Sequence, residues 1–219
     1  MAEAVVHSVP GSPFGRAVLA ALEEKGVRYR VQRVEPQTRN GPQHLARHPF
    51  GRVPVLEDGG FRLYETQAIL RYIDRVFADP PLTPADPRAA ARMDQLMGIN
   101  DWYLFPEAGR TIVFQRVVAP RLLGAPPDEG VIAAALPGAR RVLAEIARLI
   151  GDNTFLAGPA LSLADLMIAP QLDMLAATPE WQDLAPPHPT LVAWLARVVA
   201  RPSFVATTAQ LVADMVQAG

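Results

Sequence analysis

Three short motifs in the first third of the chain place hydroxyl, carboxylate and backbone donor groups where they could bind an anionic or zwitterionic ligand. The first, Ser12-Pro-Phe-Gly-Arg16, follows an apolar run and opens a helical pattern. Free N–H groups and the dipole of a helix N-terminus favour an anion, and the Ser12 hydroxyl could donate a hydrogen bond to it. Ser12 could equally be an ordinary N-cap with Pro13 at the first helical position.

The second motif, Gly51-Arg-Val-Pro-Val-Leu56, places Pro54 at the entrance of a strand. Proline cannot donate to a strand ladder, so it belongs at a strand start or on an edge strand. A cis Val53–Pro54 bond would turn the Val53 backbone groups outward, free to pair with an extended peptide. The alternative is an ordinary trans proline that opens an edge strand.

The third motif, Tyr64-Glu-Thr-Gln-Ala-Ile-Leu70, follows a short strand pattern and opens another helix. Here Glu65 could hold the ammonium group of a zwitterionic ligand. Thr66 and the N–H groups of the helix could hold its carboxylate. A plain capping arrangement, which needs no ligand, is the alternative.

The other polar motifs are more typical of structural roles than of catalysis or metal binding. Ser162-Leu-Ala-Asp165 has the spacing of a capping box, so it predicts a helix start and not a catalytic Ser/Asp pair. His44 and His48 have the i, i+4 spacing of a metal-binding face, but Pro49 follows and a third ligand is not evident, so we interpret them as loop or capping histidines. His7, in the first strand, is interpreted as a packed residue.

The composition excludes several classes of function. The 219 residues are 50% hydrophobic and carry a formal net charge of −1, which gives no electrostatic attraction to nucleic acid or to an anionic membrane. The chain contains no cysteine, so a protein thiol cannot be the nucleophile or a metal ligand. Neither a signal peptide nor a membrane span is indicated, which predicts a cytoplasmic protein.

The first half predicts a mixed α/β domain that positions the three motifs. Apolar and alternating runs predict strands in the order βαβ, a loop with a possible short helix, and then ββα, with Glu-Asp-Gly-Gly as a hairpin turn. In the first helix Val18, Leu19 and Leu22 lie at core spacing. In the last, Ala68, Ile69, Ile73 and Phe77 are predicted on one face.

A proline-rich segment separates this half from an all-α half. Residues 1–78 carry a net charge of +3 and the remainder −4, and residues 79–86 form the predicted linker because their prolines break helices. Residues 87–219 show helical periodicity throughout and predict a helical bundle. The helices are expected at 87–119, 129–150, 162–177, 189–200 and 203–217.

In this order and spacing the motifs resemble those of the cytosolic glutathione S-transferase superfamily, over essentially the whole chain. Ser12-Pro-Phe is similar to the start of serine-type members. The chain resembles bacterial members and the tau, theta and zeta classes. Gly51 to Leu56 resembles the strand that bears the family's cis-proline, and Glu65-Thr66 followed by Ala68-Ile69 resembles its glutathione-binding signature. The resemblance implies a thioredoxin-like first domain followed by an all-helical C-terminal domain.

The resemblance also implies a glutathione site in the first domain. Ser12 would be catalytic, donating its hydroxyl to the glutathione sulfur and favouring the thiolate, with Phe14 beside it. Val53 and Pro54 would bind the cysteinyl part, Glu65 and Thr66 the γ-glutamyl end, and Arg52, helped by Arg39 or Asn40, the glycyl carboxylate. The family often has Lys or Gln at the position of Arg52 and Ser at that of Thr66, which puts the affinity and not the binding in doubt.

The helical half is expected to supply an apolar electrophile pocket. The candidates in its first helix are Trp102, Phe105, Arg110 and Phe114, although most of these could instead be core residues, and Pro106 is expected to bend the helix. The implied protein is a homodimeric, cytoplasmic detoxification enzyme that joins glutathione to a hydrophobic electrophile and needs no metal.

Two alternatives stay open. One is a non-enzymatic protein of this fold that binds a protein partner through its helical half. The other is a glutathione-dependent peroxidase or dehalogenase, which would use the same thiolate.

Overall fold

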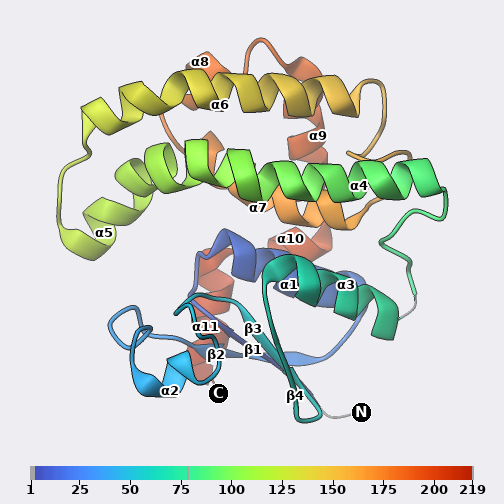
Figure 1. The fold of residues 1–219 in the computed structure, drawn as a ribbon, viewed down its shortest axis with the longest axis vertical. Helices are drawn as coiled ribbons and strands as arrows, with labels where there is room; N and C mark the ends of the chain where they lie inside the picture. Colours follow the sequence, from blue (N-terminus) through green and yellow to red (C-terminus); the bar gives the residue numbers. More distant parts are fainter. Residues whose placement is uncertain (1–2, 78, 219) are drawn as a thin grey trace. The chain divides into compact units, whose positions relative to one another are not determined.

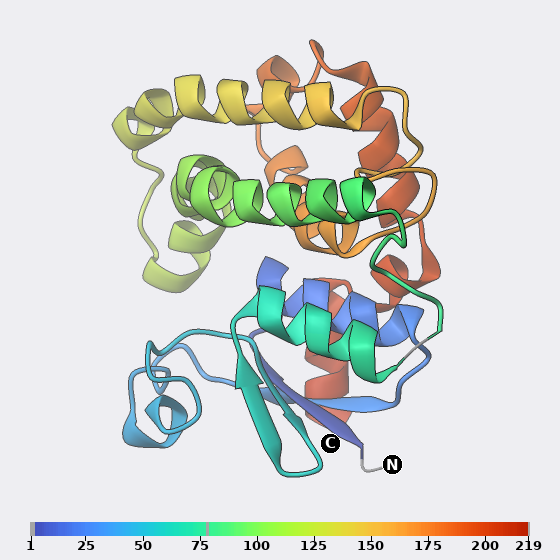
Figure 2. The same cartoon turned by 45° about the vertical axis from the view of Figure 1, so that its right-hand side comes forward.

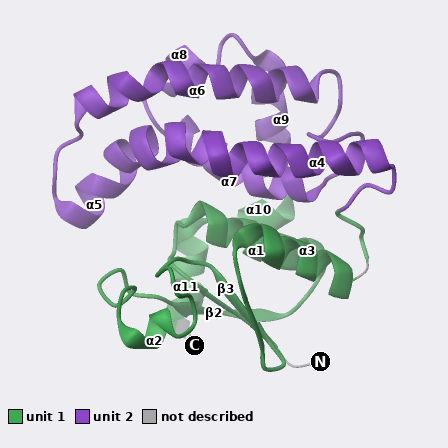
Figure 3. Cartoon of the chain, in the orientation of Figure 1, with its two compact units in different colours: residues 1–82, 200–219 green, residues 83–199 purple. Residues whose placement is uncertain are grey.

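The computed structural model describes residues 3–77 and 79–218. The chain forms two compact units: residues 1–82 with residues 200–219, here called the sheet unit, and residues 83–199, here called the helical unit (Figure 3). The predicted boundary at Ala78 falls on a residue outside the described ranges. Residues 79–86, the predicted linker, lie outside helices and strands, and the Asp86 carboxylate caps the helix that follows by accepting from Ala89 N–H at 2.8 Å.

A four-stranded sheet with the order β2-β1-β3-β4 lies at the centre of the sheet unit (Figure 1). β1 pairs in parallel with β2 and antiparallel with β3, and β3 pairs antiparallel with β4. Gly59 and Gly60, both with positive φ, form the predicted two-residue hairpin turn. The strands are β1 (Ala4–Ser8), β2 (Tyr29–Arg33), β3 (Val55–Asp58) and β4 (Phe61–Tyr64).

Two helices, α1 (Pro13–Glu24) and α3 (Thr66–Val76), lie side by side over one face of the sheet (Figures 1 and 2). The predicted core residues of α1 are buried, as are Ile69 and Ile73 of α3, so most of the helical patterns were interpreted correctly. Ala68, predicted on the same face of α3, is exposed, and Phe77 lies beyond the helix end. A short helix, α2 (Pro42–Leu45), interrupts the loop between β2 and β3.

The C-terminal residues return to the sheet unit. The expected helix 203–217 is two helices, α10 (Pro202–Ala206) and α11 (Ala209–Ala218), and the sequence had placed both in the helical domain. α10 packs against α1, and α11 packs against β2. The physical reason is a polar contact that no local pattern reveals: Arg201 binds the Glu24 carboxylate with two hydrogen bonds of 2.8 Å.

In the helical unit α7, most of whose residues are buried, packs against α4, η1 and α9. A helix that is apolar on all sides belongs in the centre of a bundle, which explains the unbroken apolar run after Asp165. The elements are α4 (Pro87–Ile99), η1 (Asn100–Val118), α5 (Ala119–Leu123), α6 (Glu129–Ile150), α7 (Leu163–Ala176), α8 (Trp181–Leu184) and α9 (Pro189–Val199).

The first of these helices corrects the prediction of a regular α-helix over 87–119. From Asn100 to Val118 its hydrogen bonds are of the wider π type, i→i+5. Asn100, Leu104, Ala108 and Ile112 are its buried residues together with Val113, and their spacing fits a turn of about 4.4 residues better than one of 3.6. Pro106 lies inside this helix and has no N–H to donate to its hydrogen bonds.

A buried ion pair fixes the chain where it leaves the sheet unit. Lys25, at the end of α1, lies 2.7 Å from the Asp74 carboxylate of α3, and its side chain is fully buried. Lys25 also donates to the Pro80 carbonyl at 2.6 Å, and Asp74 accepts from Leu82 N–H at 2.8 Å. Both charges therefore bind the start of the predicted linker.

Candidate functional site

The strand register brings the three predicted motifs to one end of the sheet. His7 of β1 is opposite Val55 of β3, and Val55 is opposite Tyr64 of β4. This row is the last one before β1 ends, the first of β3 and the last of β4. The chain segments that carry Ser12, Val53 and Glu65 consequently meet at the same end of the strands, here called the edge of the sheet. These segments are far apart in sequence.

Ser12 is the N-cap of α1, with Pro13 at the first helical position. Its hydroxyl oxygen accepts from Gly15 N–H at 3.1 Å, and the side chain is half-buried. The capping role is therefore confirmed, but it uses only the oxygen lone pair. The hydroxyl proton stays available to a ligand, so capping and donation are compatible. Phe14 lies next to it in the first turn and is also half-buried.

The Val53–Pro54 peptide is cis, which settles one of the open alternatives. Val53 precedes Val55, the first residue of β3 in the ladder, so its backbone groups lie ahead of the paired region. Gly51 has φ of 61°, and a Cβ there would collide with Asn40 Oδ1 and press on the Arg39 carbonyl. This close approach brings residues 39 and 40 beside Gly51, the residue before Arg52.

Glu65 and Thr66 open α3 in an unusual way. Glu65 has φ of 71° and ψ of 115°, and among the described non-glycine residues it alone has a positive φ. It occupies the N-cap position, yet its side chain makes no capping hydrogen bond, so the plain capping interpretation was wrong. The strained backbone instead presents an exposed carboxylate beside the N-terminus of α3. Thr66 is buried.

Charges of opposite sign lie at the two ends of this site. Arg39 and Arg52 are exposed cations on one side, near Asn40, and the Glu65 carboxylate and the α3 N-terminus lie on the other. Such a site suits an extended molecule with a carboxylate at one end and an amino acid head group at the other. Ser12 follows β1, which is the neighbour of β3 on the side away from β4. The segments that carry Ser12, Val53 and Glu65 meet at this edge, and the binding role of each predicted residue stays a prediction.

Two buried histidines, which the sequence predicts only as loop or capping residues, lie next to the segments of this site. His44 is 5% exposed and its Nε2 lies 2.8 Å from the Arg52 carbonyl oxygen, while His48 is 2% exposed and its ring centre lies 4.7 Å from that of Tyr64. The i, i+4 spacing was the only signal for them in the sequence. The described residues hold no group of three or more metal-binding side chains around them.

The predicted electrophile residues all lie on η1. Phe105 and Phe114 are half-buried and Arg110 is exposed. In an α-helix the two phenylalanines, nine residues apart, would point to opposite sides, but at about 4.4 residues per turn they are two turns apart on one face, with Arg110 close to it. Trp102 is 78% exposed and is out of phase with them. The π geometry therefore groups three of the four.

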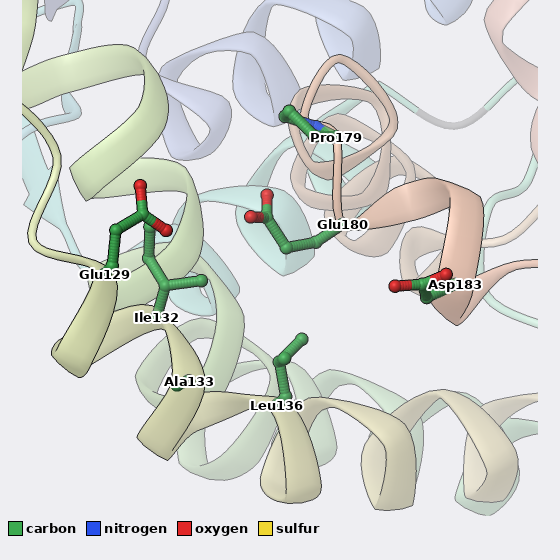
Figure 4. A pocket seen from close by; sticks show the side chains of 7 residues that line it. All are labelled: Glu129, Ile132, Ala133, Leu136, Pro179, Glu180 and Asp183. Carbon is green, nitrogen blue, oxygen red and sulfur yellow. The ribbon is translucent and has the colours of Figure 1, made fainter.

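A shallow pocket of about 230 Å³ in the helical unit lies elsewhere (Figure 4). Its lining combines three carboxylates with apolar side chains of α6 and the α7–α8 connection. Arg116 bridges two of them, at 2.6 Å from both Glu129 and Glu180. The predicted electrophile residues are not among its described lining, which is Glu129, Ile132, Ala133, Leu136, Pro179, Glu180 and Asp183.

The Ser162–Asp165 capping box is confirmed as a structural device. Asp165 is fully buried and accepts from Leu156 N–H, Ser162 N–H, Ser162 Oγ and Trp194 Nε1 at 2.7 to 2.8 Å. The pKa of Asp165 is raised above its usual value, because the effect of burial exceeds that of the four hydrogen bonds, which lower it. Because all four partners donate, the side chain acts as an acceptor that joins the start of α7 to α9.

A thioredoxin-like sheet unit and a helical unit in one chain define the class of protein. Residues 3–75 match the family model of the glutathione S-transferase N-terminal domain, and residues 129–197 match that of the C-terminal domain. The chain therefore belongs to the glutathione S-transferase family.

Several proteins named glutathione S-transferase are similar to this chain over most of its length. A probable glutathione S-transferase of rice (Oryza sativa subsp. japonica), GSTF2, is 34% identical over 84% of this chain and 86% of its own. The crystal structure of glutathione transferase F7 from Populus trichocarpa is 28% identical and covers 97% of this chain and 99% of its own, with a TM-score of 0.84. The structure of glutathione S-transferase-I bound to lactoylglutathione is 30% identical and covers 98% of this chain and 100% of its own, with a TM-score of 0.83.

The plant relatives are of the phi class, so the likeness to tau, theta and zeta members stays a prediction. Among residues 3–77 and 79–218, every helix is too short or too polar to cross a bilayer.

Proposed function

We propose that this chain is a glutathione transferase that joins the thiol of glutathione to a hydrophobic electrophile, with Ser12 as the group that stabilises the thiolate. The observation that carries the proposal is the convergence of Ser12, the Val53–Pro54 cis peptide and Glu65 at one edge of the sheet. The membership in the family and the ligand of its lactoylglutathione-bound relative support glutathione as the co-substrate.

The tripeptide lies extended along this edge in the proposal. Arg52, with Arg39 or Asn40, meets the glycyl carboxylate, and the backbone of Val53 pairs with the cysteinyl part ahead of Pro54. Glu65 binds the γ-glutamyl ammonium, while Thr66 and the N-terminus of α3 bind its carboxylate. This orientation follows the two-ended charge of the site.

Ser12 then acts on the sulfur. Its oxygen is held by Gly15 N–H, so the hydroxyl proton is directed away from the helix and donates to the thiolate. Lowering a thiol pKa from about 8.5 by about two units corresponds to about 2.7 kcal/mol, which one directed hydrogen bond and a helix N-terminus can supply. The thiol proton leaves to solvent, and Ser12 is a donor and not a base.

The chemical step is a substitution or an addition at the electrophile. With an aryl chloride, the sulfur–carbon bond forms at the expense of the carbon–chlorine bond, and chloride leaves with the bonding electrons. Phe105, Arg110 and Phe114 are the proposed contacts with the electrophile, since η1 places them near one face. We also propose a homodimer in the cytoplasm, as is usual for the family.

Calorimetric titration of the purified protein with reduced glutathione tests the proposal, with the ultraviolet absorbance of the bound thiolate followed as the pH is varied. We expect binding together with a thiolate signal well below the pKa of the free thiol. Absence of binding at millimolar glutathione would contradict the proposal and favour the partner-binding alternative. Binding without a thiolate signal would leave glutathione as a ligand and reject the role of Ser12.

A further inference from the structure

Four aromatic rings from three chain segments form a cluster next to the proposed glutathione site, with both histidines buried and Phe50 exposed. His44 belongs to α2, His48 and Phe50 to the turn after it, and Tyr64 to the end of β4. The ring centres of His44 and His48 are 6.4 Å apart, those of His48 and Tyr64 are 4.7 Å apart, and those of Phe50 and Tyr64 are 6.4 Å apart. The cluster thus spans the gap between the two ends of the site.

His44 is connected to one end of the site by a directed bond. A carbonyl oxygen can only accept, so Nε2 of His44 carries a proton and donates it to the Arg52 carbonyl, 2.8 Å away. Arg52 and Val53 lie before the β3 ladder begins, where sheet pairing does not fix them. The buried imidazole therefore supplies the anchor that the sheet does not give to this segment.

His48 is connected to the other end. Its ring packs on Tyr64, the residue before the strained Glu65, and its Nδ1 accepts from Phe50 N–H at 3.4 Å. A backbone conformation such as that of Glu65 persists only when its surroundings hold it in place. His48 is 2% exposed, so its contact with Tyr64 is a fixed part of the interior.

We infer that His44 and His48 are a pair of positioning residues that fix the Arg52–Val53 and Tyr64–Glu65 segments at the spacing required by the tripeptide. The inference rests on the proposed function. The histidines lie next to the site and do not touch the reacting sulfur. Their loss therefore weakens the binding of glutathione by removing preorganisation, and it leaves the chemical step of the bound thiolate unchanged.

Steady-state kinetics of full-length variants, with glutathione and 1-chloro-2,4-dinitrobenzene as substrates, test the role of His44. His44→Phe keeps an aromatic ring and removes the donor, whereas His44→Gln keeps an amide N–H at about the reach of Nε2. We expect His44→Phe to raise KM for glutathione about tenfold, with kcat and KM for the electrophile within about twofold, and His44→Gln to restore most of the loss.

The partner residue is tested in the same assay. His48→Leu removes the ring contact with Tyr64 and is expected to raise the same KM, whereas His188→Leu, at a half-buried histidine of the helical unit, is the matched control and is expected to change neither constant. If His44→Phe does not fold, His44→Asn replaces it, because the shorter amide does not reach the Arg52 carbonyl.

The outcomes separate the inference from the function on which it rests. An unchanged KM for glutathione in His44→Phe would overturn the inference. A lower kcat together with a higher KM for both substrates, not restored in His44→Gln, would also overturn it, because this result indicates general damage to the fold. If the wild-type chain itself does not bind glutathione in calorimetry, the proposed function fails instead, before any variant is compared.

Discussion

Ser12 performs two tasks in the proposed mechanism, and each uses a different part of one hydroxyl group. The oxygen caps α1 through Gly15 N–H, and the proton is directed to the sulfur of the ligand. Substitutions can separate these tasks, because glycine is nearly as good as serine at an N-cap, whereas alanine is worse by about 1 kcal/mol.

Ser12→Gly is therefore expected to keep most of the stability of the fold, and both Ser12→Gly and Ser12→Ala are expected to lose thiolate formation at neutral pH. The measurement is the pH profile of kcat/KM for glutathione, together with urea unfolding of both variants. Conjugation rates equal to those of the wild type at neutral pH would remove Ser12 from the mechanism.

Glu65 combines strain with binding. Replacing it with glycine relieves a backbone with φ of 71°, so we expect Glu65→Gly to be more stable than Glu65→Ala by about 1 kcal/mol. Both variants lose the carboxylate, and both are expected to bind glutathione more weakly by about 1.5 to 3 kcal/mol, the scale of a lost charged hydrogen bond. Calorimetry and urea unfolding measure the two effects. Unchanged affinity would mean that the γ-glutamyl end lies elsewhere.

At the scale of elements, the ends of helices are where charges are buried. Lys25 and Asp74 join the end of α1 to α3 and to the residues 80–82 that follow. Removing one partner leaves the other charge buried without compensation, so Lys25→Met is expected to lower the free energy of unfolding by about 3 to 5 kcal/mol. The double variant Lys25→Met/Asp74→Leu should recover part of this loss in urea unfolding. A single variant as stable as the wild type would show that the pair is not buried in solution.

Asp165, in the first turn of α7, is another buried ionisable side chain at a helix end. Asp165→Ala leaves four donors at the start of α7 and on α9 without their acceptor, and we expect a loss of about 3 kcal/mol or more. Asp128→Ala, at the exposed N-cap of α6, removes only one capping bond and serves as the comparison, with an expected loss of about 1 kcal/mol. Equal losses in the two variants would contradict the network.

The elements also show which predictions a sequence supports. The apolar spacing of α1, α6 and α7 gave their positions within a residue or two, because one face or the whole helix must be buried. The π geometry of Asn100–Val118 was missed, since its apolar residues were read with a period of 3.6. His44 and His48 were placed in a loop because the partners that give them a role, Arg52 and Tyr64, meet them only through tertiary packing.

The local structure of the three motifs could be predicted better than the residues that support them, while the binding roles of the motif residues stay predictions. Ser12, the cis-proline and Glu65 lie in local patterns that restrict the backbone, so residue types and spacing were informative. The electrophile residues depend on helix phase, and Trp102 was grouped with Phe105 and Phe114 although the π turn separates it from them. The domain boundary was placed by proline content, and proline content carries no information about where the C-terminal residues pack.

At the scale of the whole molecule, the stability of the chain should fall in mild acid. Burial lowers the pKa of both His7 and His48 below the usual 6.5, so the unfolded chain takes up protons at a higher pH than the folded one. The free energy of unfolding therefore decreases as the pH falls below about 6.5, and this contribution levels off below the folded-state pKa values. Urea unfolding between about pH 8 and about pH 5 measures it.

His7→Leu should show a smaller decrease over this range than the wild type, because one of the two groups no longer titrates. A second decrease is expected below the usual carboxyl pKa of 4.5. Burial tends to raise the pKa of Glu24, but hydrogen bonds from Arg201 and Ser203 bring it below that value, and their contribution is lost as Glu24 takes up a proton. A stability that does not change down to about pH 5 would contradict the histidine contribution.

The return of residues 200–219 to the sheet unit has a consequence for how the protein is made. A ribosome releases the residues of β1, α1 and α3 long before it has added Arg201, Phe204 and α11. Domains form as units during synthesis, yet here the contacts of Glu24 and Arg16 with the last helices must wait for the end of translation. The nascent sheet unit thus emerges with the α10-binding side of α1 uncovered, and Glu24 and Arg16 stay without these contacts until the residues after the helical unit have been added.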